Sequence, residues 1–182
     1  MIFKAHCLFL LFSPVKYQNV CAGSILNSWL IISAAHCFYQ ETPMQFLIIP
    51  KMFNASTDIR PYHKWPYQSH KIQEIFIHER FDYSSGYNDI AIASLQSPLE
   101  VNETISFYGG NFSFHGGNCS VAGYGNHAKI LTESKAALYP YQECNATLYK
   151  YLMNGYGGVM KLYPGNVCAH PQTCDVLLLK KP

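Results

Sequence analysis

The chain has 182 residues, of which 13% are charged and 15% are aromatic, and its net charge is +2. This composition argues against disorder, and the length is enough to bury a core. The basic residues form no block, so we expect neither nucleic acid nor a membrane surface as a partner. The longest apolar run near the start, Cys7–Phe12, is far too short to span a membrane.

Cysteines and glycosylation sequons indicate the compartment. The seven cysteines are an odd number, so at least one stays free or pairs between chains. Several Asn-x-Ser/Thr sequons in a cysteine-bearing chain favour the secretory pathway. They begin at Asn54, Asn102, Asn111, Asn118 and Asn145. We expect glycosylation at these sites except Asn118, whose sequon contains Cys119, a candidate for a disulfide.

The first predicted element is a strand over Leu8–Phe12, a continuous run of apolar residues. The alternative is a signal peptide over residues 1–13, for which Lys4 supplies the positive charge. The short apolar run and the lack of an Ala-x-Ala site argue for the strand.

A hairpin with a histidine at its end follows. Ser24–Leu26 and Trp29–Ile32 are rich in β-forming residues, and the Asn-Ser pair between them is typical of a turn. Cys21 and Cys37 can lie at the ends of this hairpin, which makes a disulfide between them plausible. His36, beside such a bridge, would have the fixed position that a catalytic base needs.

The middle of the chain predicts two more strands. Gln45–Ile49 is the first, and Pro50 ends it. Residues 51–70 are expected to form a long surface loop. Asp58 is the only acid in that loop, so we expect no metal site there. Lys71–Ile77 alternates polar and apolar residues and predicts a half-buried strand.

A further strand is expected within Asn88–Leu95. Its apolar residues Ile90, Ile92 and Leu95 follow an acid, Asp89. An acid that opens such a strand suits a carboxylate at the edge of the core.

The remainder of the chain predicts a linker and a second set of elements. Residues 100–117 contain two Gly-Gly pairs and are expected to form an exposed linker. The elements expected after it are strands over Cys119–Gly125, Ile130–Leu138 and Asn166–Ala169, and a short helix over Tyr141–Tyr149.

Four of these segments resemble motifs of one enzyme family. Ala34–Cys37, after an apolar strand and with Cys21–Ser24 upstream, resembles the histidine motif of trypsin-like serine peptidases. Asn88–Ile92 resembles the aspartate motif of the same family. Cys119–Gly125 resembles its Cys-x-x-x-Gly-Trp-Gly strand, with tyrosine in place of tryptophan, and Asn166–Ala169 resembles its Met-x-Cys-Ala strand.

The resemblance implies an all-β fold, the trypsin-like double β-barrel, with the first barrel near-complete and the second incomplete. It implies one peptidase-like domain over residues 7–175. The first sub-barrel would span about 7–105 and the partial second about 116–175, leaving residues 176–182 as an unmatched tail.

The resemblance also assigns site residues. His36 would be the general base, and Asp89 would fix its tautomer and stabilise the imidazolium. The implied disulfides are Cys21–Cys37 and Cys144–Cys168. No cofactor and no metal are expected. We also considered a zinc site built from His6, Cys7, His36 and Cys37, but its cysteines are better used as bridges and the usual paired spacing is absent.

The nucleophile motif of the family does not occur in the sequence. In the family a cysteine leads into Gly-Asp-Ser-Gly-Gly-Pro, which supplies the serine and the oxyanion hole. Here Cys174 is followed by Asp175 and then by residues 176–182, and Gly-x-Ser-x-Gly is found nowhere. Cys119 and Cys174 would then lack their family partners unless they pair with each other, and Cys7 is a third leftover. We do not expect Ser33, Ser84 or Ser94 to replace the nucleophile.

These observations leave two functions open. A peptidase that loses one triad residue still accelerates hydrolysis about 10³–10⁴-fold over the reaction in water, through its oxyanion hole and substrate binding. In this chain the oxyanion hole and the substrate pocket are both expected to be missing. The first function is therefore a secreted serine endopeptidase, acting on protein or peptide substrates, that is incomplete and inactive as this chain. The alternative is a non-catalytic homologue that acts as a secreted binding or decoy module. Both place the protein outside the cell.

Overall fold

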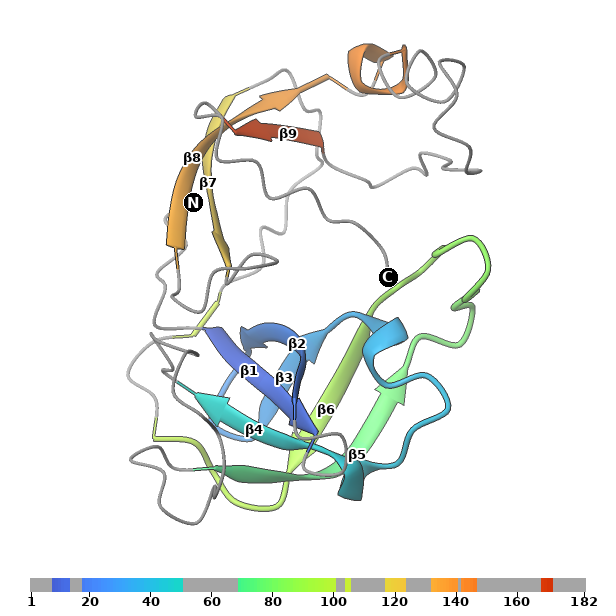
Figure 1. The fold of residues 1–182 in the computed structure, drawn as a ribbon, viewed down its shortest axis with the longest axis vertical. Coiled ribbons are helices and arrows are strands. Elements are labelled where there is room, and N and C mark those ends of the chain that lie inside the picture. The colour runs from blue at the N-terminus through green and yellow to red at the C-terminus, as the bar shows by residue number, and fades with distance from the viewer. Residues whose placement is uncertain are drawn as a thin grey trace.

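The computed structural model describes eight segments of the chain. They are residues 8–13, 18–50, 69–100, 104–105, 117–123, 132–140, 142–146 and 168–171. In these segments strands predominate, arranged as a closed barrel and a separate sheet (Figure 1). This is the all-β, double-barrel class that the sequence predicts, with the first barrel closed.

Six antiparallel strands close the first barrel. They are β1 (Leu8–Ser13), β2 (Gln18–Ile25), β3 (Leu30–Ser33), β4 (Leu47–Pro50), β5 (His70–Ile77) and β6 (Ala91–Leu95). Their order around the barrel is β1-β2-β3-β6-β5-β4, and β4 pairs with β1 to complete the circle. Two short 3₁₀ helices, η2 (Ala35–Cys37) and η3 (Pro43–Gln45), lie between β3 and β4.

The predicted hairpin between β2 and β3 is confirmed. The side-chain oxygen of Asn27 accepts hydrogen bonds from the backbone N–H groups of Trp29 and Leu30, at 2.7 and 2.9 Å. This local bond is the reason that asparagine favours turns. It sets the register in which Ser24 lies opposite Ile32.

The inner face of β6 is formed by two alanines and a leucine and not by its isoleucines. Ala91, Ala93 and Leu95 are buried, whereas Ile90 is exposed and Ile92 is only partly buried. The interior of a six-stranded barrel is narrow, so small residues alternate with large ones to fill it. The large side chains in that interior come from neighbouring elements: Ile25, Ile31, Phe38, Phe46, Ile48 and Ile72.

Strand β5 is buried only near its start, whereas the sequence predicts a half-buried strand along its whole length. Its buried residues are His70 and Ile72, and an irregularity in its pairing with β6 follows between Ile72 and Glu74. Beyond it, Phe76 and Ile77 are exposed. Such a bulge changes which side chains face inward, and a strict period-two prediction cannot include it.

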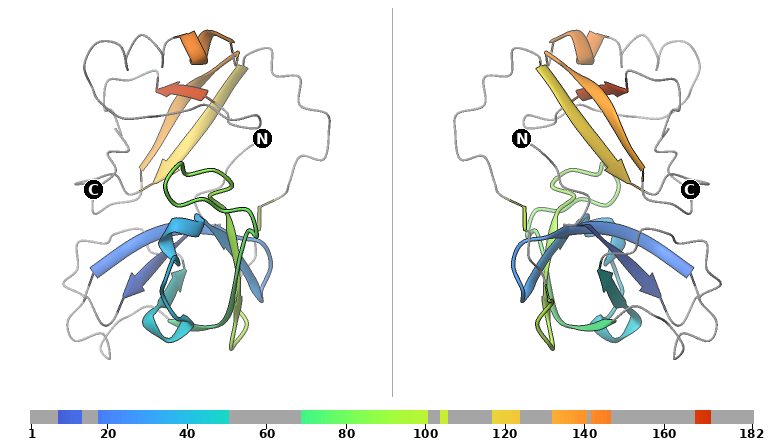
Figure 2. Two further views of the ribbon diagram at one scale, coloured as in Figure 1. Left: turned by 90° about the vertical axis from the view of Figure 1, so that its right-hand side faces the viewer. Right: turned by 90° about the vertical axis from the view of Figure 1, so that its left-hand side faces the viewer.

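The second sheet has the order β7-β8-β9 and stands beside the barrel in all three views (Figures 1 and 2). Its strands are β7 (Gly117–Gly123), β8 (Thr132–Tyr139) and β9 (Cys168–Pro171). Residues 142–146, within the predicted helix, are helical. A disulfide between Cys144 and Cys168 joins this helical turn to β9.

Several predicted features lie outside the described residues. These are residues 51–68 of the loop predicted over 51–70, the sequons at Asn54, Asn102 and Asn111, most of the linker, the tail, and residues His6, Cys7 and Cys174. The predicted loop is one residue too long at its end, because His70 already belongs to β5. Asn145 is exposed on the helical turn, as a glycosylation site requires. The sub-barrel boundaries remain predictions. In the part of the chain that is described, no helix is long and apolar enough to cross a membrane.

Candidate active site

His36 lies on η2, directly after β3. Its neighbours Ala35 and Phe38 are fully or almost fully buried, so the short helix is anchored in the barrel core. The His36 side chain itself is 52% exposed. Burial of the flanking residues therefore holds the backbone at this point and leaves the imidazole accessible to solvent.

Asp89 lies two residues before the start of β6, at the end of a tight loop. The preceding residue, Asn88, has a φ of 54°, in the left-handed region that asparagine tolerates better than most residues. Its side-chain amide donates to the carbonyl oxygen of Arg80 at 2.9 Å, which fixes the turn. This turn determines where the Asp89 carboxylate enters the site.

The pairing of β3 with β6 brings the two residues together. In this antiparallel pair Ser33 lies opposite Ala91. His36 comes three residues after Ser33 and Asp89 two residues before Ala91, so both lie beyond the same end of the pair. This register places two residues that are 53 positions apart in the sequence at one point on the barrel.

Both oxygens of Asp89 accept hydrogen bonds from His36. Oδ2 lies 2.7 Å from the ring Nδ1, and Oδ1 accepts from the backbone N–H of His36, also at 2.7 Å. An ionised carboxylate can only accept, so Nδ1 of the neutral ring carries the proton and Nε2 carries the lone pair. One carboxylate thus orients both the backbone and the ring, and Nε2 is left as a proton acceptor.

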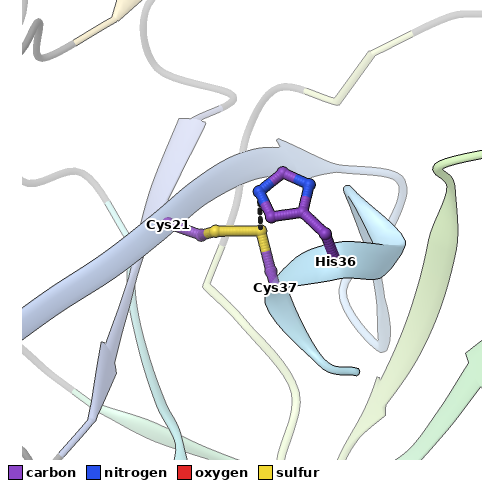
Figure 3. Close-up of side chains that lie close together, drawn as sticks. All are labelled: Cys21, His36 and Cys37. Atoms are coloured by element: carbon purple, nitrogen blue, oxygen red, sulfur yellow. Dashed lines mark hydrogen bonds between the residues drawn. A yellow bond between two sulfur atoms is a disulfide. The ribbon is translucent and has the colours of Figure 1, made fainter. Parts of the chain in front are cut away.

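A disulfide between Cys21 on β2 and Cys37 on η2 closes the other side of the site. The structure therefore contains both bridges that the family resemblance implies. Nε2 of His36 lies 3.6 Å from the sulfur of Cys37 (Figure 3). Ser33 is buried, with its hydroxyl 3.9 Å from the same sulfur, and that hydroxyl donates to the carbonyl oxygen of Ala22 at 2.8 Å.

The loop before Asp89 contains an acid, Asp82, whose pKa is shifted by its hydrogen bonds. The hydroxyl of Ser85, and then the hydroxyl and backbone N–H of Ser84, donate to the carboxylate of Asp82. These bonds lower the pKa of Asp82, with the Ser85 bond as the largest cause. Charged Asp82 therefore holds the turn that leads to Asp89.

Two of the three serines considered as replacement nucleophiles, Ser33 and Ser84, are engaged elsewhere. The hydroxyl of Ser33 donates to Ala22, and that of Ser84 donates to Asp82. Within the described segments, no hydrogen bond joins either serine to His36. The role of Asn88 in orienting Asp89 was not predicted from the sequence. The signal for it is an asparagine, a residue that tolerates left-handed turns, directly before the acid that precedes a strand.

The family of trypsin matches the chain over residues 9–175. This range covers both the closed barrel with the His36–Asp89 pair and the three-stranded second sheet. The chain therefore belongs to the trypsin family of serine-peptidase-like proteins.

Proposed function

We propose that His36 and Asp89 form the proton-transfer half of a serine-endopeptidase site that acts on proteins or peptides. The observation that carries this proposal is the 2.7 Å contact between His36 Nδ1 and Asp89 Oδ2 on an exposed histidine. It supports a fixed tautomer with Nε2 free to take a proton from a serine hydroxyl and return it to a leaving amine. Asp89 stabilises the imidazolium that forms in between.

We further propose that the 182-residue chain has no peptidase activity by itself. Acyl transfer needs a nucleophile and an oxyanion hole, and the sequence contains no Gly-x-Ser-x-Gly. A histidine–aspartate pair without a nucleophile forms no acyl-enzyme. The sequons and the two disulfides support a secreted protein.

Labelling with a serine-directed phosphonate tests the inactivity of this chain. We expect neither labelling nor hydrolysis of peptide substrates by the purified 182-residue protein. Covalent labelling of any serine would overturn this part of the proposal, and peptide mapping would identify the residue.

The transcript beyond the codon for Cys174 separates the two candidate functions. An in-frame Gly-Asp-Ser-Gly-Gly would support a peptidase, and its absence would support a binding or decoy module. In a product that carries the motif, we expect Asp89→Asn to lower kcat by about 10⁴-fold, because the wrong histidine tautomer is favoured. His78→Ala, on an exposed histidine outside the pair, is the matched control and should leave kcat unchanged.

A further inference from the structure

Three metal-ligating side chains converge beside the barrel wall. The sulfurs of Cys21 and Cys37 and a ring nitrogen of His36 all lie within 4.8 Å of one another (Figure 3). In the oxidised protein the two sulfurs are bonded to each other, so they offer no thiolate to a metal. Reduction would place two thiols and one imidazole in the same small volume.

The spacing of the histidine and Cys37 already suits a zinc ion. A tetrahedral zinc with Zn–S of about 2.3 Å and Zn–N of about 2.0–2.1 Å separates its sulfur and nitrogen ligands by about 3.5 Å. The distance from His36 Nε2 to Cys37 Sγ is 3.6 Å. The two sulfurs would have to move apart to about 3.8 Å, the sulfur–sulfur edge of the same tetrahedron. Rotation about a Cα–Cβ bond can supply this movement.

The surroundings of His36 suit a metal ligand as well. Histidines that bind metals almost always donate their second ring N–H to a carboxylate or carbonyl, which fixes the tautomer and raises the basicity of the ligating nitrogen. The 2.7 Å contact from His36 Nδ1 to Asp89 Oδ2 is such an arrangement, and it leaves Nε2 on the side of the sulfurs. The Ser33 hydroxyl, 3.9 Å from Cys37 Sγ, is a second polar group beside the sulfurs.

We propose that reduction of the Cys21–Cys37 disulfide creates a zinc site made of Cys21, Cys37 and His36 Nε2, with the fourth position open to water. Two cysteines and one histidine with an open position are an established donor set for zinc. The disulfide takes up two electrons and two protons from a dithiol, which becomes a cyclic disulfide, and two thiols form. Zinc binding then releases the two thiol protons.

Metal binding and base catalysis at His36 exclude each other. Both use the lone pair of Nε2, because Asp89 occupies Nδ1. The site would therefore exist in two forms: a bridged form with a free base and a reduced form with the base bound to metal. The sequence-based prediction was that the protein has no metal site, and this proposal departs from it for the reduced form.

A cobalt titration tests the site on the full chain. Cys7, Cys119, Cys144, Cys168 and Cys174 are replaced by serine, so that only the two proposed thiolates remain. After reduction with a water-soluble phosphine, we expect one equivalent of Co²⁺ to bind with a thiolate-to-cobalt charge-transfer band, and Zn²⁺ to displace it. The oxidised protein should show no such band. A reduced protein that binds no Co²⁺, or an oxidised protein that binds equally well, would overturn the proposal.

Substitutions around the histidine separate a folded site from loose thiols. We expect Asp89→Asn, which removes the partner of the ligating histidine, to weaken Zn²⁺ affinity by about 10–100-fold. His36→Ala removes a ligand itself and should weaken the affinity at least as much. His78→Ala is the control and should have no effect. Equal affinity in all four proteins would mean that zinc binds an unfolded dithiol, and would also overturn the proposal.

A second comparison avoids the multiple serine replacements, which risk misfolding. The chain with its seven cysteines is reduced, loaded with Zn²⁺ and desalted beside a Cys21→Ser/Cys37→Ser variant. We expect the variant to retain one equivalent of zinc fewer, and equal zinc contents would contradict the assignment. These binding measurements do not depend on peptidase activity, so their failure is distinguishable from failure of the proposed catalytic role.

Discussion

Asp89→Asn is the sharpest test of the His36–Asp89 pair in the chain as it stands. The change keeps the shape of the side chain and removes its charge. Asparagine retains one oxygen, which can still accept from the backbone N–H of His36. Its amide nitrogen would then face Nδ1–H, donor against donor. The ring has to give up the proton on Nδ1 and carry it on Nε2 instead.

The expected cost in stability follows from the two hydrogen bonds. Bonds to a charged acceptor contribute about 1.5–3 kcal/mol and neutral ones about 0.5–1.5 kcal/mol, so losing the charge costs about 1 kcal/mol for each fully buried bond. Here the side chains of His36 and Asp89 are 52% and 29% exposed, which weakens both bonds. We therefore expect the free energy of unfolding to fall by about 1 kcal/mol in total.

Two measurements check this prediction. Urea denaturation gives the change in stability, and ¹⁵N chemical shifts of the imidazole show which ring nitrogen is protonated. Glu79→Gln is the matched control, because it also removes one carboxylate. Glu79 is 81% exposed, and its ion pair with the neighbouring Arg80, at 3.5 Å, is a surface pair. We therefore expect this control to change the free energy of unfolding by less than about 0.5 kcal/mol. An unchanged stability together with a proton still on Nδ1 in Asp89→Asn would refute the reasoning.

Three further predictions concern the elements around the site. Replacing Cys21 and Cys37 by alanine should lower the free energy of unfolding by about 3 kcal/mol, from the loop entropy of a 16-residue separation, and denaturation under oxidising conditions measures this. Ala93→Leu should lower the free energy of unfolding by about 1–3 kcal/mol, because Ala93 is 1% exposed and a larger side chain would overpack the barrel interior. A thermal scan would detect the change, and an unchanged midpoint would contradict the tight barrel interior. The hydrogen bonds in the folded protein lower the pKa of Asp82 below its ordinary value of 3.8. The stability that Asp82 gives to the loop is therefore complete above the unfolded-state pKa and is lost as the pH falls through the folded-state pKa. The amide chemical shift of Ser84, which donates to Asp82, should accordingly titrate with a midpoint below 3.8. A midpoint above 3.8 would reverse that sign.

Much of the fold was predictable from local patterns. The Asn27 turn, the flanking β-forming segments and the apolar run of β4 each predict their element by local chemistry alone. The predicted first and last residues of the elements are less accurate than the elements themselves. The segment expected as a strand from Gln45 begins as a 3₁₀ turn, because Pro43 starts η3 and a capping box links Thr42 with Gln45.

The inward faces of β5 and β6 were not predictable in the same way. A barrel interior selects side chains by the space left between all six strands, and a period-two pattern contains no measure of that space. Alanines at 91 and 93 therefore face inward while larger isoleucines beside them do not. The bulge after Ile72 likewise depends on how β5 pairs with β6.

By itself the sequence determined the chemical groups and their order along the chain: a histidine next to a cysteine, an aspartate at the start of a later strand, and the motifs that indicate the family. Only the tertiary structure decided that these groups meet. The β3–β6 register brings Asp89 to Nδ1 of His36 across 53 residues, and the β2–β3 hairpin brings Cys21 to Cys37. The position of Nε2 beside the sulfurs depends on both contacts, because one orients the ring and the other places the bridge.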